Sequence, residues 1–317
     1  MNNEGSIFSM LHEKLMRSTI RLYSEANLNS KGATFMKKTF LWGFIVVLLF
    51  ISAPTAHAAE IQIKVDGVAV VSDVKPEMNN KRTMVPLRVI SESLGAKVKW
   101  TNSEVILAKG DMEVSLKLNS MTAQKNGETI QLDVKPYTKN NRVFVPLRFI
   151  AEVFGCKVNY SNFAVTVDTK PFVIEGVQVK ALQLEYHMTM GGVVQQIIGN
   201  AYTETFYNIL EKNKGEKVEA PANYSWNPTL DIPGSYYKNT QYDFLDLKGN
   251  SIVRYDVYSL IGTYPFELAS GYPEILIHDV SKDEWFLFSK SAEQSLYQLF
   301  DIAAQNGFMT IISNTVA

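Results

Sequence analysis

Residues 80–88 read Asn-Lys-Arg-Thr-Met-Val-Pro-Leu-Arg, and residues 140–148 read Asn-Asn-Arg-Val-Phe-Val-Pro-Leu-Arg. The same offset of 60 extends outward from these stretches without an insertion, so that 18 of the 43 residues in 67–109 are identical to their counterparts in 127–169. Identity at a constant register indicates an internal repeat. We therefore expect residues 59–171 to form one domain from two repeats of 60 residues.

Each repeat predicts one short helix. Pro86 stands where a helix would begin, because proline lacks an N–H that the first turn leaves unbonded. Leu87, Ile90 and Leu94 follow at helical spacing, and Gly95 is placed to end the helix with a positive φ. The second repeat carries Pro146, Leu147, Ile150, Phe154 and Gly155 at these positions. With β-rich runs around each helix, the fold class expected is α+β, built from duplicated small antiparallel β units with one short helix each.

Arginine and glutamate recur four residues apart on both predicted helices. The pairs are Arg88 with Glu92 and Arg148 with Glu152. A twin anion site on the two arginines is one interpretation. An intrahelical ion pair explains the repetition more simply, and such a pair contributes only a few tenths of a kcal/mol.

The doubled pattern resembles a known domain family, the copper amine oxidase-like N-terminal domain, also called the stalk domain. The residues that carry the resemblance, each with its second copy, are the run Asn80–Arg88 followed by Glu92, Gly95, Lys97-Val98 and Trp100. The resemblance covers about residues 61–170. It implies a small antiparallel sheet wrapped on helices, secretion from Gram-positive bacteria and attachment to unrelated partner domains.

The resemblance does not bring copper amine oxidase chemistry with it. That chemistry requires a quinone made from tyrosine in an Asn-Tyr-Asp/Glu context, and three histidine copper ligands, two of them in His-x-His. The chain has no His-x-His, and the Asn-Tyr pairs at Asn159 and Asn223 are each followed by serine. We therefore expect no catalytic residue, no cofactor and no bound metal, and we expect the protein not to be an enzyme.

Residues 36–58 predict a secretory signal peptide. They contain the basic start Met36-Lys37-Lys38, an apolar run over 40–51 and the cleavage pattern Ala56-His57-Ala58. Twelve apolar residues make a helix about 18 Å long, too short for a hydrocarbon core of about 30 Å. We expect cleavage after Ala58 and no permanent membrane span afterwards, and a permanent anchor is the alternative.

Residues 1–35 are interpreted as an upstream extension, with translation starting at Met36. The motivating observation is Lys31-Gly32-Ala33, which can be encoded by a purine-rich ribosome-binding sequence at a suitable distance. A long basic region before the apolar run is the alternative.

Composition excludes several classes of protein. The chain of 317 residues has 31 Lys and Arg against 32 Asp and Glu, so no bulk positive field attracts nucleic acid. One cysteine, Cys156, excludes an intramolecular disulfide framework and is expected to be a small buried thiol. A secreted or cell-wall-associated protein made without disulfides fits these observations.

Residues 172–317 predict a second α+β domain of unknown family. Two hairpins are expected, 242–247 with 252–258 and 275–278 with 285–288. A helix is expected from Ser291 to Gly307, and a last strand over 309–312. The stretch 193–199 is read as a helix turn. Together with residues 224–226 it is faintly similar to the helix-then-sheet unit of β-lactamase-inhibitor-like domains.

The segment 221–242 stands out because it holds three prolines and five aromatic residues. Prolines forbid a continuous helix or central strand, so part of the segment is expected to be a surface loop that presents aromatic rings to a sugar or a protein. The candidate binding residues are Tyr224, Trp226, Tyr236, Tyr237 and Tyr242. The alternative is that Tyr224 and Trp226 are inward residues of an edge strand.

These patterns predict a secreted, non-catalytic cell-envelope protein. Its stalk-like module would present a C-terminal binding domain to a cell-wall polymer or an envelope protein, and no nucleic acid is expected as a partner. Two alternatives place other functions in residues 172–317. One is a protein inhibitor, and the other is a hydrolase of unrecognised type that uses two of the carboxylates of Asp243, Asp246, Asp256, Glu267 and Glu274.

Overall fold

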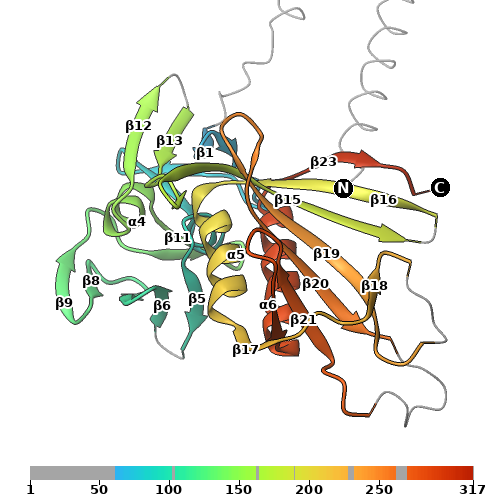
Figure 1. The fold of residues 1–317 in the computed structure, drawn as a ribbon. Coiled ribbons are helices and arrows are strands. Elements are labelled where there is room, and N and C mark those ends of the chain that lie inside the picture. The colour runs from blue at the N-terminus through green and yellow to red at the C-terminus, as the bar shows by residue number, and fades with distance from the viewer. Residues whose placement is uncertain are drawn as a thin grey trace, which may run out of the picture. The chain divides into compact units, whose positions relative to one another are not determined.

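The computed structural model describes residues 61–101, 104–161, 164–188, 190–227, 232–261 and 270–316. The predicted signal peptide and upstream extension lie outside the described residues. Residues 59–317 form one compact unit. The described part is mostly β-strand with four helices, consistent with the α+β class (Figure 1). None of these helices combines the length and the apolar character that a membrane crossing requires.

The repeat region consists of short strands and two short helices. In chain order these are β1 Gln62–Val65, β2 Val68–Ala69, β3 Glu77–Asn79, β4 Arg82–Pro86, α3 Leu87–Ser93, β5 Lys97–Trp100, β6 Glu104–Lys109, β7 Met112–Lys117, β8 Thr122–Lys125, β9 Glu128–Gln131, β10 Tyr137–Lys139, β11 Arg142–Pro146, α4 Leu147–Val153, β12 Lys157–Ser161 and β13 Ala164–Asp168.

The remainder has longer strands and two longer helices. These are β14 Val173–Ile174, β15 Val177–Met188, β16 Gly191–Ile198, α5 Asn200–Lys212, β17 Lys214–Val218, β18 Asn223–Ser225, β19 Ser235–Asp246, β20 Ser251–Leu260, β21 Ile275–Asp279, β22 Glu284–Phe288, α6 Lys290–Gln305 and β23 Met309–Asn314.

The two repeats pair with each other through β4 and β11. These strands are antiparallel, with Val85 opposite Val145, Pro86 opposite Phe144, and Met84 opposite Pro146. Val85 and Val145 are sixty residues apart, the offset of the repeat. Equivalent residues of the two repeats therefore surround the Val85–Val145 pair symmetrically.

Two reciprocal ion pairs link the repeats in the same symmetric way. Arg82 Nε lies 2.7 Å from Asp133 Oδ2, and Arg142 Nη2 lies 2.6 Å from Asp73 Oδ2. Each arginine thus reaches the aspartate of the other repeat. All four side chains are about half exposed, so each pair adds about 0–1 kcal/mol and mainly favours this register.

The repeats also exchange strands. β1 and β2, from the start of the first repeat, extend the sheet of the second in the order β12-β13-β1-β2. β8 and β9, from the start of the second repeat, extend the sheet of the first in the order β5-β6-β7-β8-β9. β5 and β12, which correspond by the offset of 60, are consequently both edge strands.

The helices α3 and α4 pack their apolar residues into the core, as predicted. Leu87 and Leu147 are 1% and 0% exposed. Gly95 has φ +83° and its N–H donates to the Glu92 carbonyl at 2.9 Å, so it ends the helix as expected. Pro86 lies one residue before the helix instead of within it.

The predicted intrahelical ion pair forms in the second repeat, where Arg148 Nε lies 4.0 Å from Glu152 Oε1. In the first repeat, Glu92 accepts a hydrogen bond of 3.4 Å from Asn306 at the end of α6. Burial raises the pKa of this carboxyl group, and the Asn306 bond opposes the change. The two repeats therefore differ where the first one meets the C-terminal region.

A ten-stranded sheet organises residues 173–314. Its path is β17-β22-β21-β20-β19-β15-β16-β23, with β14 added to β15 and β18 added to β19. α5 and α6 lie next to each other against one face (Figure 1). One hydrophobic core joins this face to the repeats, since it includes Ile63 and Leu147 as well as Phe206 and Leu296. The domain boundary expected at 171/172 stays a prediction.

The turn between β1 and β2 connects the repeat region to α5. The Asp66 carboxylate accepts hydrogen bonds from the backbone N–H of Asn200 at 3.0 Å and of Thr169 at 2.9 Å. Asn200 is the first residue of α5. A carboxylate at this end satisfies an otherwise free N–H and interacts favourably with the helix dipole.

A bulge in β19 changes which side chains face the helices. The register with β20 shifts between Lys238 and Thr240. Tyr242, after the shift, belongs to the helix-side core, whereas Tyr236, before it, does not. On the opposite face a separate cluster forms from Tyr236, Tyr258, Leu276 and Trp285.

The predicted hairpins are confirmed as β19–β20 and β21–β22, and the last strand as β23. The helix turn predicted at 193–199 is wrong, because these residues lie in β16 and Val193, Gln195 and Ile197 are buried in strand alternation. The helix predicted from Ser291 begins earlier, since Ser289 Oγ caps it by accepting from the Ala292 N–H at 3.1 Å.

Removing the side chains of Leu87 or Leu147 tests the helical core. Leu87→Ala and Leu147→Ala are each expected to lower the free energy of unfolding of residues 59–317 by about 2–5 kcal/mol, because both leave a cavity. Urea denaturation measures the change. Arg88→Ala, exposed on the same helix, should lower it by less than about 1 kcal/mol. An equal loss for Arg88→Ala and Leu87→Ala would contradict the packing described.

Candidate functional site

The face of the ten-stranded sheet opposite α5 and α6, which we call the outer face, carries a row of polar side chains. The pairing places Glu185 opposite Gln241, Gln241 opposite Asp256, Asp256 opposite His278, and His278 opposite Trp285. Five neighbouring strands thus align one residue each. Their immediate neighbours along the strands, such as Tyr255 and Ile277, point into the helix-side core.

A buried ion pair lies at the middle of this row. Lys238 Nζ is 2.5 Å from Asp256 Oδ2, and the two side chains are 9% and 2% exposed. Arg254 Nη2 approaches the same oxygen at 3.3 Å. Burial lowers the pKa of Lys238, while the hydrogen bond to Asp256 acts in the opposite direction. The carboxylate is therefore compensated by two cations that the sequence analysis did not single out.

Two atoms beside this ion pair lack hydrogen-bond partners. Asp256 Oδ1 and Arg254 Nε are both buried and unpaired, and among the described residues only Ser91 Oγ shares this property. Leaving a buried polar group unpaired costs about 1–3 kcal/mol. One atom is an acceptor and the other a donor, and they belong to side chains on the same face of β20. A hydroxyl group, which both donates and accepts, has the chemistry to satisfy both.

Trp226 lies next to the ion pair. Its ring centroid is 4.7 Å from Lys238 Nζ and 4.4 Å from the centroid of the His187 ring. His187 Nε2 is 2.7 Å from Glu185 Oε1, and the Tyr237 hydroxyl donates to the His187 carbonyl. The half-buried indole is thereby fixed between a cation and an imidazole at the edge of the polar row.

Tyr224 belongs to a second aromatic group on the outer face. It is 41% exposed, and its ring stands edge-on to Trp285 and Tyr258 at centroid distances of 4.7 and 5.6 Å. Trp285 is buried and stacks on His278 at 4.3 Å. Tyr224, Tyr258 and Trp285 thus form an aromatic cluster, in which the Tyr224 ring is the exposed one.

The five aromatic residues predicted to bind do not form one surface in the structure. Tyr236 and Tyr242 are 1% and 3% exposed, so the expectation that they lie on a surface loop is wrong. The reason is that β19 begins at Ser235 and includes both. Tyr224 and Trp226 lie along the outer face, whereas Tyr237, between Tyr236 and Lys238 on β19, points to the opposite face. A role in binding stays a prediction for these residues.

Of the five carboxylates considered for catalysis, Asp243 and Asp256 lie on the outer face. Arg254 faces Asp243 across the strands and also contacts Asp256. Burial raises the pKa of Asp243, and the charge of Asp256 acts in the same direction. Asp246 instead accepts hydrogen bonds within its turn, Glu274 is exposed, and Glu267 lies outside the described residues.

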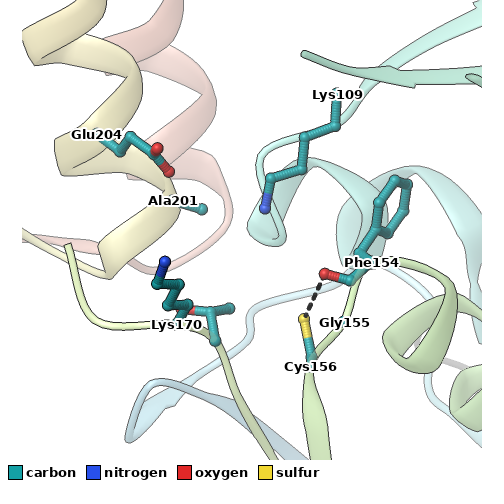
Figure 2. Close-up of a pocket in the computed structure, with 8 residues that line it drawn as sticks. Lys109, Phe154, Gly155, Cys156, Lys170, Ala201 and Glu204 are labelled. Atoms are coloured by element: carbon teal, nitrogen blue, oxygen red, sulfur yellow. Dashed lines mark hydrogen bonds between the residues drawn. The ribbon is translucent and has the colours of Figure 1, made fainter. Parts of the chain in front are cut away.

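A small cavity lies between the repeat region and α5 (Figure 2). Its volume is about 60 Å³, which holds a few water molecules and no sugar ring. The side chains of Lys109, Lys170 and Glu204 surround it, and Lys109 Nζ donates to the Leu94 carbonyl at 2.7 Å. Cys156 is buried here as predicted, and burial raises the pKa of its thiol. The cavity is therefore a small polar gap inside the unit, where the repeat region packs against α5.

Comparison with known proteins adds a domain assignment. Residues 64–176 match the model of the copper amine oxidase N-terminal domain family. This segment belongs to that family. In copper amine oxidases this N-terminal domain is non-catalytic, and no catalytic family is identified for the chain. Among the described residues, no three His, Cys, Asp or Glu side chains are grouped so that they could hold a metal ion.

A similar protein from Brevibacillus choshinensis is named protease inhibitor. It is 27% identical over 152 residues, which are 47% of this chain and 46% of that protein. The chain thus spans about half the length of this curated relative. No solved structure matches the chain.

Breaking the buried ion pair on one side tests the description of the outer face. Lys238→Met is expected to lower the free energy of unfolding by about 3–5 kcal/mol, because it leaves the Asp256 carboxylate buried with only the longer Arg254 contact. Chemical denaturation of residues 59–317 gives the value. The double variant Lys238→Met/Asp256→Leu should lose less than Lys238→Met alone, since no charge is left uncompensated.

The control is an exposed ion pair in the same sheet. Lys217 Nζ lies 2.9 Å from Glu284 Oε1, and the lysine side chain is 61% exposed. Lys217→Met should therefore change the stability by less than about 1 kcal/mol. If Lys238→Met were no more destabilising than Lys217→Met, the Lys238–Asp256 pair would not be buried as described.

Proposed function

We propose that this is a secreted, non-catalytic cell-envelope protein. The copper amine oxidase N-terminal domain supports a C-terminal binding domain, whose outer face binds a hydroxyl-rich cell-wall glycan. Location outside the cytoplasm is supported by the signal-peptide pattern over residues 36–58. The single cysteine fits a secreted protein made without disulfides.

The observation that carries the glycan assignment is the polar row of the outer face, with Glu185, Gln241 and Asp256 side by side and aromatic rings next to it. Sugar hydroxyls both donate and accept hydrogen bonds, which suits a row that mixes carboxylate and amide groups. The exposed ring of Tyr224 offers an apolar surface for the C–H face of a sugar ring, while Trp226, held between Lys238 and His187, fixes the position of the polar groups beside it.

The same face is a poor match for a protein partner. The centres of protein–protein interfaces are depleted in charged residues. The middle of the outer face instead carries Lys238, Arg254 and Asp256, with Glu185 and Asp243 close by. A row of charged groups between aromatic rings favours the cell-wall polymer over the envelope protein as ligand.

A hydrolase is the second candidate, favoured by the proximity of Asp243 and Asp256. In glycoside hydrolases one carboxyl group holds its proton while the other stays ionised. Burial raises the pKa of Asp243, as the acid role requires, and Asp256, paired with Lys238, is the second carboxyl group. Turnover of a glycan that is abolished by Asp243→Asn would replace the binding proposal with this one.

The third class, a protein inhibitor, is supported by the name of the Brevibacillus choshinensis relative. It predicts that residues 59–317 inhibit serine, cysteine or metalloproteases in stoichiometric amounts. Inhibition without glycan binding would favour this class.

Binding to insoluble peptidoglycan freed of phosphodiester polymers tests the proposal. Residues 59–317 are expected to sediment with it, and Trp226→Ala should weaken the affinity roughly tenfold, the equivalent of about 1.4 kcal/mol. Thermal melting of each variant verifies the fold.

The matched control is Tyr297→Ala on α6, on the other side of the sheet. Tyr297 is 46% exposed, similar to Tyr224, so its removal takes an exposed aromatic ring without touching the outer face. It should leave sedimentation unchanged. Equal binding of Trp226→Ala and wild type, with both proteins folded, would refute the outer face as the binding site.

A further inference from the structure

The two corresponding edge strands of the repeat domain each expose one aromatic residue. Trp100 ends β5, and Tyr160 occupies the position sixty residues later in β12. Their side chains are 44% and 46% exposed. Most other large side chains of this domain are buried in its core, so these two rings are left on the surface in equivalent places.

The equivalence is spatial as well as sequential. The symmetric pairing of β4 with β11 around Val85 and Val145 relates one repeat to the other. β5 and β12 are both sheet edges and have no strand beyond them in the described part of the chain. A ligand would therefore meet two similar surfaces on one domain.

Basic side chains accompany both rings. Lys97 and Lys99 are exposed on β5, and Lys157 is exposed on β12. The guanidinium carbon of Arg148 lies 5.2 Å from the centroid of the Tyr160 ring, and Arg88 is exposed at the corresponding position of α3. Each edge thus carries a flat apolar ring on one face of its strand and lysine on the other. At the second edge Glu152 lies 4.0 Å from Arg148 and Asp168 stands opposite Lys157, so this edge is the less basic of the two.

The charge of the whole domain has the same sign. Residues 61–171 contain 16 Lys and Arg against 11 Asp and Glu, whereas residues 172–317 contain 9 against 17. The formal charges are +5 and −8, which the nearly neutral total conceals. An anionic ligand is attracted to the repeat domain and repelled by the rest of the chain.

We propose that the repeat domain binds a polyanion of repeating phosphodiester and polyol units at these two edges. Lysine and arginine match phosphodiester charges, and the exposed rings match the C–H surface of the polyol or sugar between them. A repeating polymer suits two equivalent edges, because the second contact forms at a high effective concentration after the first. Both the ligand and the surface differ from those of the proposed function. Polyanion binding at the edges can therefore fail while glycan binding at the outer face holds, and the reverse is also true.

Titration with poly(glycerol phosphate) tests the inference on residues 59–317. Calorimetry is expected to give a binding isotherm that weakens as salt is raised from 50 to 200 mM, roughly tenfold or more, because counterions are released from the polymer. Trp100→Ala and Tyr160→Ala should each weaken binding several-fold. The double variant should weaken it by more than either single variant.

A second set of substitutions keeps the test independent of the rings. Lys97→Gln/Lys99→Gln/Lys157→Gln should reduce the affinity at least tenfold and flatten its salt dependence, and these exposed side chains lie outside the core. Tyr297→Ala, which removes an exposed ring from the acidic half, should leave polymer binding unchanged. Unaltered binding by both the double aromatic and the triple lysine variants would overturn the proposal.

Two competition experiments distinguish the polymer from other anionic ligands. Single-stranded DNA presents the same charge with stacked bases, and phosphatidylglycerol vesicles present it on a flat surface. The proposal expects both to compete at least tenfold more weakly than poly(glycerol phosphate) at equal phosphate concentration. Equal or stronger competition by either one would overturn the assignment to a phosphodiester–polyol polymer.

Discussion

The antiparallel pairing of Val85 with Val145 is the contact on which the repeat domain depends. Both residues are almost completely buried, and a slip of one residue would turn their side chains away from the core. The reciprocal pairs Arg82–Asp133 and Arg142–Asp73 favour the same register, although they are too exposed to contribute much energy. Because the pairing joins equivalent positions, each repeat receives the first two strands of the other. The edge strands of these two sheets therefore come in equivalent pairs, β5 with β12 and β2 with β9.

The exchanged strands also position the C-terminal region. β1 pairs with β13 of the second repeat, and the turn after β1 brings Asp66 to the start of α5. Asp66 thereby joins Thr169, at the end of the repeats, to the helix that covers the large sheet. With α5 and α6 occupying one face, the opposite face retains its polar row. The repeat domain fixes the start of α5 against one face of the large sheet, and the candidate site consequently lies on the other face.

Local patterns in the sequence predict the elements whose side chains follow one period. The helices after Pro86 and Pro146 and the two C-terminal hairpins belong to this group. The stretch 193–199 misleads because its paired valines and isoleucines fit either period, and the strand forms because β15 and β23 bond to both sides. The bulge at Lys238 has no signal in the sequence, yet it decides that Tyr236 and Tyr242 face opposite sides. The Lys238–Asp256 pair joins two strands and becomes visible only in three dimensions.

The division of charge between the two halves also bears on why they form one unit. A repeat domain of formal charge +5 packs against a region of −8, so their mutual attraction adds to the shared apolar core. Side chains of both signs line the polar cavity between the two halves, with Lys109 and Lys170 from the repeats and Glu204 from α5 (Figure 2). The outer face lies on the side of the large sheet that α5 does not cover, away from this cavity. The two edges carry the positive sign of the repeat domain, whereas the outer face of the acidic half holds both signs of charge, since Lys238 and Arg254 lie against Asp256.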